Sequence, residues 1–279
     1  MHLNFHFTTV QTLWTLTFAA HLVLLVVLLG RDRVRRFPWF TAAITLVALR
    51  LLTSRLLFGR LPQMEMSEIF IVLADASSLI GLLVVVELAR RAFPRAPRKL
   101  LLTWGAVLLA IGAVVLATWG PWPALKTLTP LTPMSVLGMM QLFAQKAGTL
   151  VDVTTVGLGL LVALFGRRYG SGWRGHAQLI VIGLSTASLA QLAVQIIWQI
   201  IAKTAAPHSM AEYQRVIGLR EKLFNANSVI YLLVAVWWIV CLWIDEPGES
   251  VAAVAAAPVL AAPADTKSAS AEVPRNSGE

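Results

Sequence analysis

The chain has 279 residues, of which 57% are hydrophobic and 13% are charged, and its formal net charge is +9. The charged share is about half that of an ordinary soluble domain, and a single core could not bury so much apolar surface. The composition excludes a soluble enzyme, a coiled coil and a disordered chain, and the single cysteine, Cys241, excludes a disulfide framework.

Seven apolar stretches are long enough to cross a bilayer, which takes about 20 residues of helix. We expect all seven to be helices, because lipid offers no hydrogen-bond partner to an open backbone. In chain order the predicted spans are residues 10–29, 38–58, 67–89, 100–118, 146–165, 176–202 and 223–244. The predicted fold is therefore an all-α integral membrane protein, a seven-transmembrane-helix bundle.

Basic residues divide the linkers into two groups. The linkers at 30–37, 90–99 and 167–175 hold 12 Lys and Arg in 27 positions, whereas the other three hold 6 in 55. The positive-inside rule then predicts an outside N-terminus and a cytoplasmic C-terminus, in a plasma membrane or a bacterial inner membrane. The Arg-rich linkers also predict contact with anionic lipid head groups. This explains much of the net charge without a nucleic-acid partner.

The last segment, residues 245–279, is rich in Ala and Pro and lacks aromatic residues. Such a composition predicts a disordered cytoplasmic tail. The tail is too short to hold a kinase or cyclase domain. A signalling function would therefore require a separate cytoplasmic protein partner.

Polar side chains recur at similar depth in the outer halves of several spans, and we call this set the polar layer. An ionisable residue at membrane depth is costly, so it marks either a partner or a function. Three glutamines spaced by four residues in the sixth span form one helix face, which we expect to face the bundle interior. The candidate ligand-binding residues of the polar layer are Arg50, Asp75, Asp152, Gln191, Gln195, Gln199 and Tyr231.

Two interpretations of the polar layer remain open. In the structural one, Arg50 pairs with Asp75 on the next helix, and the glutamines link neighbouring helices. In the functional one, the layer lines an outward-open pocket for a small polar or charged ligand. Asp152 has no obvious cation nearby in sequence, so it would be protonated, paired with Lys146 or bound to a ligand.

Two further features concern helix packing. A stripe of small residues in the fourth span predicts a close-packing face, inside the bundle rather than in a dimer; it comprises Ala106, Ala110, Ala113 and Ala117. Glu87 and Arg90 at the inner end of the third span predict a solvated pair, with a latch as the alternative.

Known membrane chemistries find little support. Retinal needs a Schiff-base lysine in the last span, and residues 223–244 contain none. A b-type haem needs facing histidines, and only His21 lies deep, where we expect a hydrogen-bonded core residue. Neither HExxH nor a Walker sequence occurs. We therefore expect no cofactor, no metal and no catalytic residues, which argues against an enzyme.

These features favour a sensor or other ligand-binding membrane protein with an outward-facing polar pocket. Apolar runs such as 22–29, 82–86 and 232–240 predict a closed inner half. The alternatives are a small-solute transporter and a non-catalytic structural or assembly subunit. Transporters often carry internal repeats and interrupted helices. The absence of a convincing repeat and of a mid-span proline lowers the transporter interpretation but leaves it open.

Overall fold

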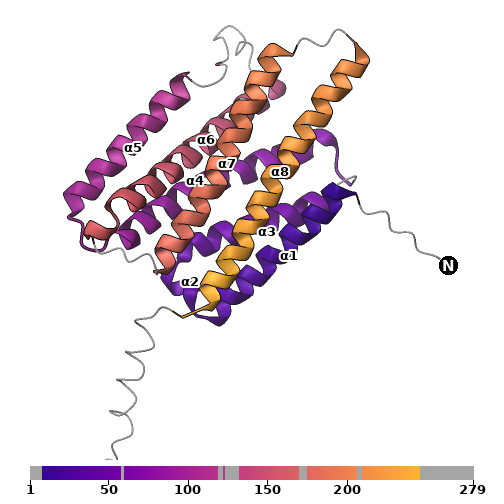
Figure 1. Cartoon of the computed structure of the whole chain (residues 1–279). Helices are drawn as coiled ribbons and strands as arrows, with labels where there is room; N and C mark the ends of the chain where they lie inside the picture. Colours follow the sequence, from indigo (N-terminus) through magenta and orange to yellow (C-terminus); the bar gives the residue numbers. More distant parts are fainter. Residues whose placement is uncertain are drawn as a thin grey trace, which may run out of the picture. The chain divides into compact units, whose positions relative to one another are not determined.

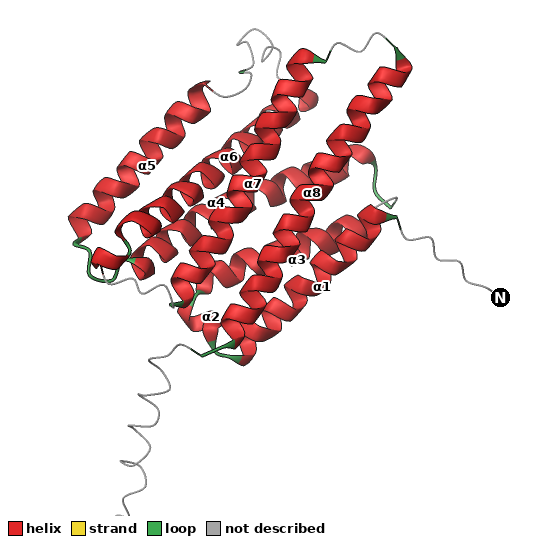
Figure 2. Ribbon diagram, viewed as in Figure 1, coloured by secondary structure: helices red, strands yellow, loops and turns green. Residues whose placement is uncertain are grey.

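A computed structural model of the chain describes residues 8–57, 60–118, 122, 132–169, 175–205 and 209–245. All regular structure within these ranges is helical, as Figure 2 shows. Seven of the described helices are long and apolar enough to cross a membrane. The prediction of an all-helical chain with seven membrane-length helices is therefore confirmed. The predicted tail lies outside the described residues, apart from Asp245.

The helices follow one another with short connections wherever the linkers are described. A short helix, α2 (Arg33–Arg36), interrupts the first Arg-rich linker, and a 3₁₀ turn, η2 (Arg167–Tyr169), begins the third. The seven long helices are α1 (Thr9–Gly30), α3 (Pro38–Leu57), α4 (Gln63–Ala92), α5 (Arg98–Thr118), α6 (Pro133–Phe165), α7 (His176–Thr204) and α8 (Met210–Trp243).

Helices α6 and α8 begin 13 residues before the predicted spans at 146 and 223. Each starts at a side-chain cap: Thr132 accepts from the N–H of Ser135, and Ser209 accepts from the N–H of Glu212. Such caps start a helix in polar sequence, where an apolar window finds no signal. The 34 residues of α8 correspond to about 51 Å of helix, which exceeds a hydrocarbon core of about 30 Å.

The contacts of six of the long helices close into a ring, and Figure 1 shows α5 at the edge of the bundle. Around the ring each helix packs on the next in the order α1, α3, α4, α6, α7, α8 and back to α1, and α4 also contacts α7. Helix α5 stands outside the ring and packs on α6. We call the end of the bundle where α1 ends and α3 begins the arginine end, because the described parts of the Arg-rich linkers lie there. We call the other end the opposite end.

The alanine stripe of α5 does not pack inside the bundle, so that expectation was wrong. All four alanines, Ala106, Ala110, Ala113 and Ala117, are exposed. The packed face of α5 instead carries Gly112, which lies against Leu150, and Leu108, which lies against Gly157 of α6. A leucine of each helix therefore enters a gap left by a glycine of the other, and this fit orients α5.

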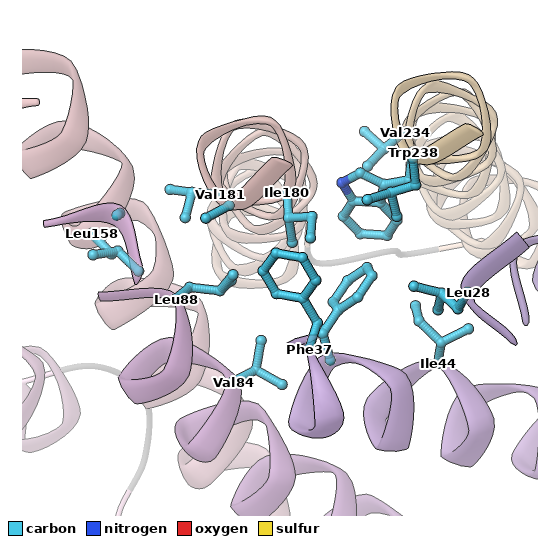
Figure 3. Packing of buried hydrophobic residues seen from close by; sticks show 14 of the residues in the cluster. Leu28, Phe37, Ile44, Val84, Leu88, Leu158, Ile180, Val181, Val234 and Trp238 are labelled. Carbon is cyan, nitrogen blue, oxygen red and sulfur yellow. The ribbon is translucent and has the colours of Figure 1, made fainter. Parts of the chain in front are cut away.

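The apolar core fills the half of the ring at the arginine end. Figure 3 shows side chains of α1, α3, α4, α6, α7 and α8 converging around Phe37 and Trp238. Phe37 is fully buried, and Trp238 is 1% exposed. The labelled members of this cluster are Leu28, Phe37, Ile44, Val84, Leu88, Leu158, Ile180, Val181, Val234 and Trp238. The core thus closes one end of the bundle.

Candidate functional site

A pocket of about 340 Å³ lies at the opposite end, between α1, α3 and α8. Its volume falls in the lower part of the range of small-molecule sites. The lining residues are Val10, Leu13, Trp14 and Thr17 of α1, Leu51 of α3, and Asn225, Asn227, Ser228 and Tyr231 of α8. An apolar wall with a few convergent polar groups is typical of a ligand-binding site.

The pocket is shallow relative to the bundle. Along α1 its lining runs from Val10 to Thr17, which is about 10 Å of helix. The whole of α1 has 22 residues and is about 33 Å long. The next inward-facing side chain, His21, is fully buried. The pocket therefore ends before the middle of the helix.

Tyr231 forms the floor of the pocket together with His21 behind it. The ring of His21 contacts the carbonyl oxygen of Thr17 through Nδ1 at 2.6 Å and the Tyr231 hydroxyl through Nε2 at 2.9 Å. The two rings are stacked with their centroids 5.5 Å apart. The expectation that His21 is a hydrogen-bonded core residue is confirmed.

The direction of these hydrogen bonds follows from the carbonyl group. A carbonyl oxygen can only accept, so Nδ1 of His21 carries the hydrogen. Complete burial favours the neutral ring, which then accepts at Nε2 from the Tyr231 hydroxyl. The phenolic oxygen of Tyr231 therefore keeps its lone pairs as acceptors.

The polar side of the pocket is held by contacts from outside it. Asn227 donates through Nδ2 to Oε1 of Gln191 on α7 at 2.6 Å. Ser228 donates its hydroxyl hydrogen to the backbone oxygen of Phe224 at 3.0 Å. These bonds restrict the orientation of both polar side chains before any ligand arrives.

The residues of the predicted polar layer do not form one site in the structure. Tyr231 lines the pocket, and Gln191 touches it through Asn227. Gln195 and Gln199 are half-buried on α7 but do not line the pocket. The glutamine face therefore contributes one contact to this site, which supports the pocket from behind.

The predicted ion pair between Arg50 and Asp75 is not formed. Arg50 is exposed, and Oδ1 of Asp75 is buried with no hydrogen-bond partner among the described residues. Matching depth sets the level of two side chains but not their direction around each helix axis. Consecutive residues of a helix point about 100° apart, and in α3 it is Leu51 that faces the pocket.

Asp152 belongs to a separate contact between α6 and α7. Its side chain interacts with that of Ser188, which is buried on α7. Lys146 points instead toward α5, where Nζ donates to the backbone oxygen of Leu116 at 3.3 Å and lies 4.7 Å from the ring centroid of Trp122. This part of the polar layer links neighbouring helices, in agreement with the structural interpretation.

Sequence reasoning missed most of the lining residues. The polar residues in the outer half of the first span, Gln11, Thr12 and Thr15, are exposed and do not line the pocket. A usable signal was present, because Val10, Trp14, Thr17 and His21 recur at spacings of three and four residues and so share one helix face. The partner face on α8, which carries Asn227 and Tyr231, has the same period.

The described lining of the pocket offers groups that can form hydrogen bonds and apolar contacts. It contains amides, hydroxyls, aromatic rings and aliphatic side chains, and none of these described residues is a carboxylate, a cysteine or a lysine. Among the described residues no group of three or more His, Cys, Asp or Glu is placed to hold a metal ion. No protein-family model, no curated protein and no solved structure matches this chain.

Proposed function

We propose that this multi-pass membrane protein is a receptor-type ligand-binding protein. A small molecule enters the pocket between α1, α3 and α8, and its binding is communicated to a cytoplasmic partner at the arginine end. The observation that carries the proposal is that the pocket ends at Tyr231, above a continuous apolar core. A receptor needs a site on one side and a closed half on the other.

The same observation argues against the transporter. A transporter needs a path that reaches both sides of the membrane, through a site near the midplane. Below Tyr231 the next layer consists of Trp238 and Phe40, each 1% exposed, whose rings pack edge to face at 5.2 Å. This layer separates the pocket from the arginine end.

A chain of direct contacts links the pocket to the arginine end. Tyr231 meets Trp238 edge to face at 6.5 Å, and Trp238 meets Phe40 at the start of α3. The backbone N–H of Phe40 in turn donates to Glu87 on α4. The contacts that begin at Tyr231 therefore extend over three helices, α8, α3 and α4. Physical contact alone is not coupling, so the proposal requires a measured response at the arginine end.

The location of the two ends is part of the proposal. The positive-inside rule supports a cell membrane in which the arginine end faces the cytoplasm and the pocket faces outward. Arginines at that end, including Arg35 and Arg91, are partly or largely exposed. They would meet anionic lipid head groups and a cytoplasmic protein partner.

The test is a binding screen on protein reconstituted in lipid nanodiscs. Polar and amphiphilic metabolites are ranked by the shift in melting temperature, and each hit is measured again in Leu51→Trp, which fills the pocket. The matched control is Leu49→Trp, because Leu49 is 49% exposed on the same helix and points away from the pocket. We expect binding to be lost in Leu51→Trp and kept in Leu49→Trp.

Uptake into proteoliposomes then separates the remaining functions. A hit that binds in the pocket and does not accumulate in the vesicles supports the receptor. Accumulation that Leu51→Trp abolishes would replace the receptor by a transporter. A screen without any pocket-dependent hit would favour a structural or assembly subunit. The exposed alanine face of α5 supports the structural or assembly subunit as the second candidate function, since small residues let membrane helices approach closely.

A further inference from the structure

We infer that the pocket takes an uncharged ligand that combines a hydrogen-bond-donating head group with a flat apolar body, as in a phenol. The inference rests on the binding function proposed above and names the class of ligand. It differs from the sequence-based expectation of a polar or charged ligand. Three properties of the pocket carry it: the charge of its lining, the direction of its hydrogen bonds and the shape of its apolar wall.

Among the described residues, the lining carries no ionised side chain. The nine described lining residues are aliphatic, aromatic, amide or hydroxyl residues. Transfer of an ion from water into such a site is strongly unfavourable without a counter-charge. The nearby floor residue His21 is neutral by the argument above and already bonded on both nitrogens. An uncharged ligand therefore enters this pocket at far lower cost than a carboxylate or an ammonium.

The hydroxyl groups of Tyr231 and Ser228 act as acceptors toward the pocket, because their hydrogens are already donated elsewhere. Tyr231 donates its hydroxyl hydrogen to Nε2 of His21, and Ser228 donates its hydroxyl hydrogen to the backbone oxygen of Phe224. Asn227 donates one N–H to Gln191 and keeps both its carbonyl oxygen and its second N–H. An unused acceptor is best satisfied by an O–H or N–H of the ligand. A ligand that only accepts would leave these oxygens unpaired.

The apolar wall favours a flat body. Trp14 is stacked on Phe18, with the ring planes only 10° apart and the centroids separated by 5.5 Å, so the indole ring has a fixed face. Leu13 and Leu51 extend the apolar surface beside it. A volume of about 340 Å³ suits one ring system with a short substituent rather than a long acyl chain. A donor head toward Tyr231 and a ring beside Trp14 fill both parts of the pocket.

The test compares four probes that differ in one group. They are 4-propylphenol, its methyl ether 4-propylanisole, 4-propylbenzoate and 4-propylbenzylammonium, each titrated against the protein in nanodiscs. The pocket-specific part of the binding is the difference between the wild type and Leu51→Trp, which removes partition into lipid from the comparison. We expect 4-propylphenol to bind at least about tenfold more tightly than the anisole, since one donor is lost, and more tightly than either ion.

Variants then connect this preference to the named acceptors. Ser228→Ala removes one acceptor at a helix position where alanine is well tolerated, and it should reduce the ratio between phenol and anisole affinity. Tyr231→Phe should reduce the ratio further, with Leu49→Trp as the unchanged control. If Tyr231→Phe proves unstable, Ser228→Ala alone carries the comparison.

The outcomes separate this inference from the proposed function. Equal pocket-specific affinities for phenol and anisole, or tighter binding of either ion, would overturn the ligand class and leave the binding function standing. Failure of all four probes would also overturn the ligand class. The proposed function falls only if the wider metabolite screen yields no hit that Leu51→Trp abolishes.

Discussion

The carboxylate of Glu87 on α4 caps the start of α3, because its Oε2 accepts a hydrogen bond from the backbone N–H of Phe40 at 3.1 Å. The first N–H groups of a helix lack partners within that helix, and a negative charge is favourable at this end of the helix dipole. Glu87 is buried, and its other oxygen lies 3.8 Å from Nη2 of Arg91. The predicted solvated pair of Glu87 with Arg90 is thus wrong: the residue joins two helices.

This cap predicts a selective loss of stability. Glu87→Ala should lower the free energy of unfolding by about 2 kcal/mol, because a buried N–H loses a charged acceptor. Thermal unfolding in nanodiscs measures the change. Glu68→Ala is the control, since Glu68 is exposed on the same helix and should change stability by no more than about 0.5 kcal/mol. Equal melting temperatures for the two variants would refute the capping role.

Gly183 allows α7 to approach Trp238 of α8 closely, and this contact gives a second prediction. A Cβ atom at position 183 would lie 2.8 Å from Cε2 of Trp238 and 3.1 Å from Cγ1 of Val234. Gly183→Ala should therefore destabilise the fold by roughly 1–3 kcal/mol through overpacking. Gly105→Ala serves as the control, because nothing lies within 4 Å of its added Cβ and helix propensity favours alanine. Similar unfolding curves for both variants would contradict the close contact.

The number of membrane-length helices could be predicted from the sequence, but the rotation of each helix about its own axis could not. Apolar length identifies a membrane helix because lipid selects for it along the whole span. The direction of a side chain depends on which neighbours the helix packs against. Arg50 and Leu51 have nearly the same depth, yet Leu51 faces the pocket and Arg50 is exposed. The prediction that the alanine stripe of α5 packs inside the bundle was wrong for the same reason. The face of α5 that packs on α6 carries Gly112 instead.

The floor of the pocket also lay beyond sequence reasoning. His21 and Tyr231 are 210 residues apart in the chain and meet only because α1 and α8 are neighbours in the closed ring. Tyr231 was identified by its depth, and His21 by its position inside a span. The sequence around either residue does not predict that the two side chains are in contact. The pairing follows from the ring of helices, which local patterns do not specify.

The separation of Arg50 from Asp75 predicts additive mutations. Two residues in one ion pair show a coupling energy in a double-mutant cycle, whereas independent residues add within about 0.5 kcal/mol. We expect Arg50→Ala, Asp75→Ala and the double variant to be additive in thermal stability. Asp152→Ala with Ser188→Ala is the positive comparison, since those two side chains interact. A large coupling between Arg50 and Asp75 would mean that the two side chains meet in the membrane.

The orientation of the bundle can be decided by labelling single cysteines in intact cells. Cys241 is the only cysteine, so Cys241→Ser provides a background without thiols. Gln214→Cys places a thiol on the exposed first turns of α8 at the opposite end, and Lys99→Cys places one at the exposed start of α5 at the arginine end. Because the arginine end should lie in the cytoplasm, a membrane-impermeant maleimide should label Gln214→Cys in intact cells and Lys99→Cys only after lysis.

The reverse labelling pattern would mean that the bundle has the opposite orientation in the membrane. It would place the pocket in the cytoplasm, where a ligand would have to come from inside the cell, and the proposed receptor would lose its outward site. Labelling of both positions in intact cells would point to two opposite insertions of the same chain. The background variant without thiols should remain unlabelled before and after lysis. Labelling of Gln214→Cys alone would support an outward pocket, because α8 carries both that position and the pocket residues Asn227 and Tyr231.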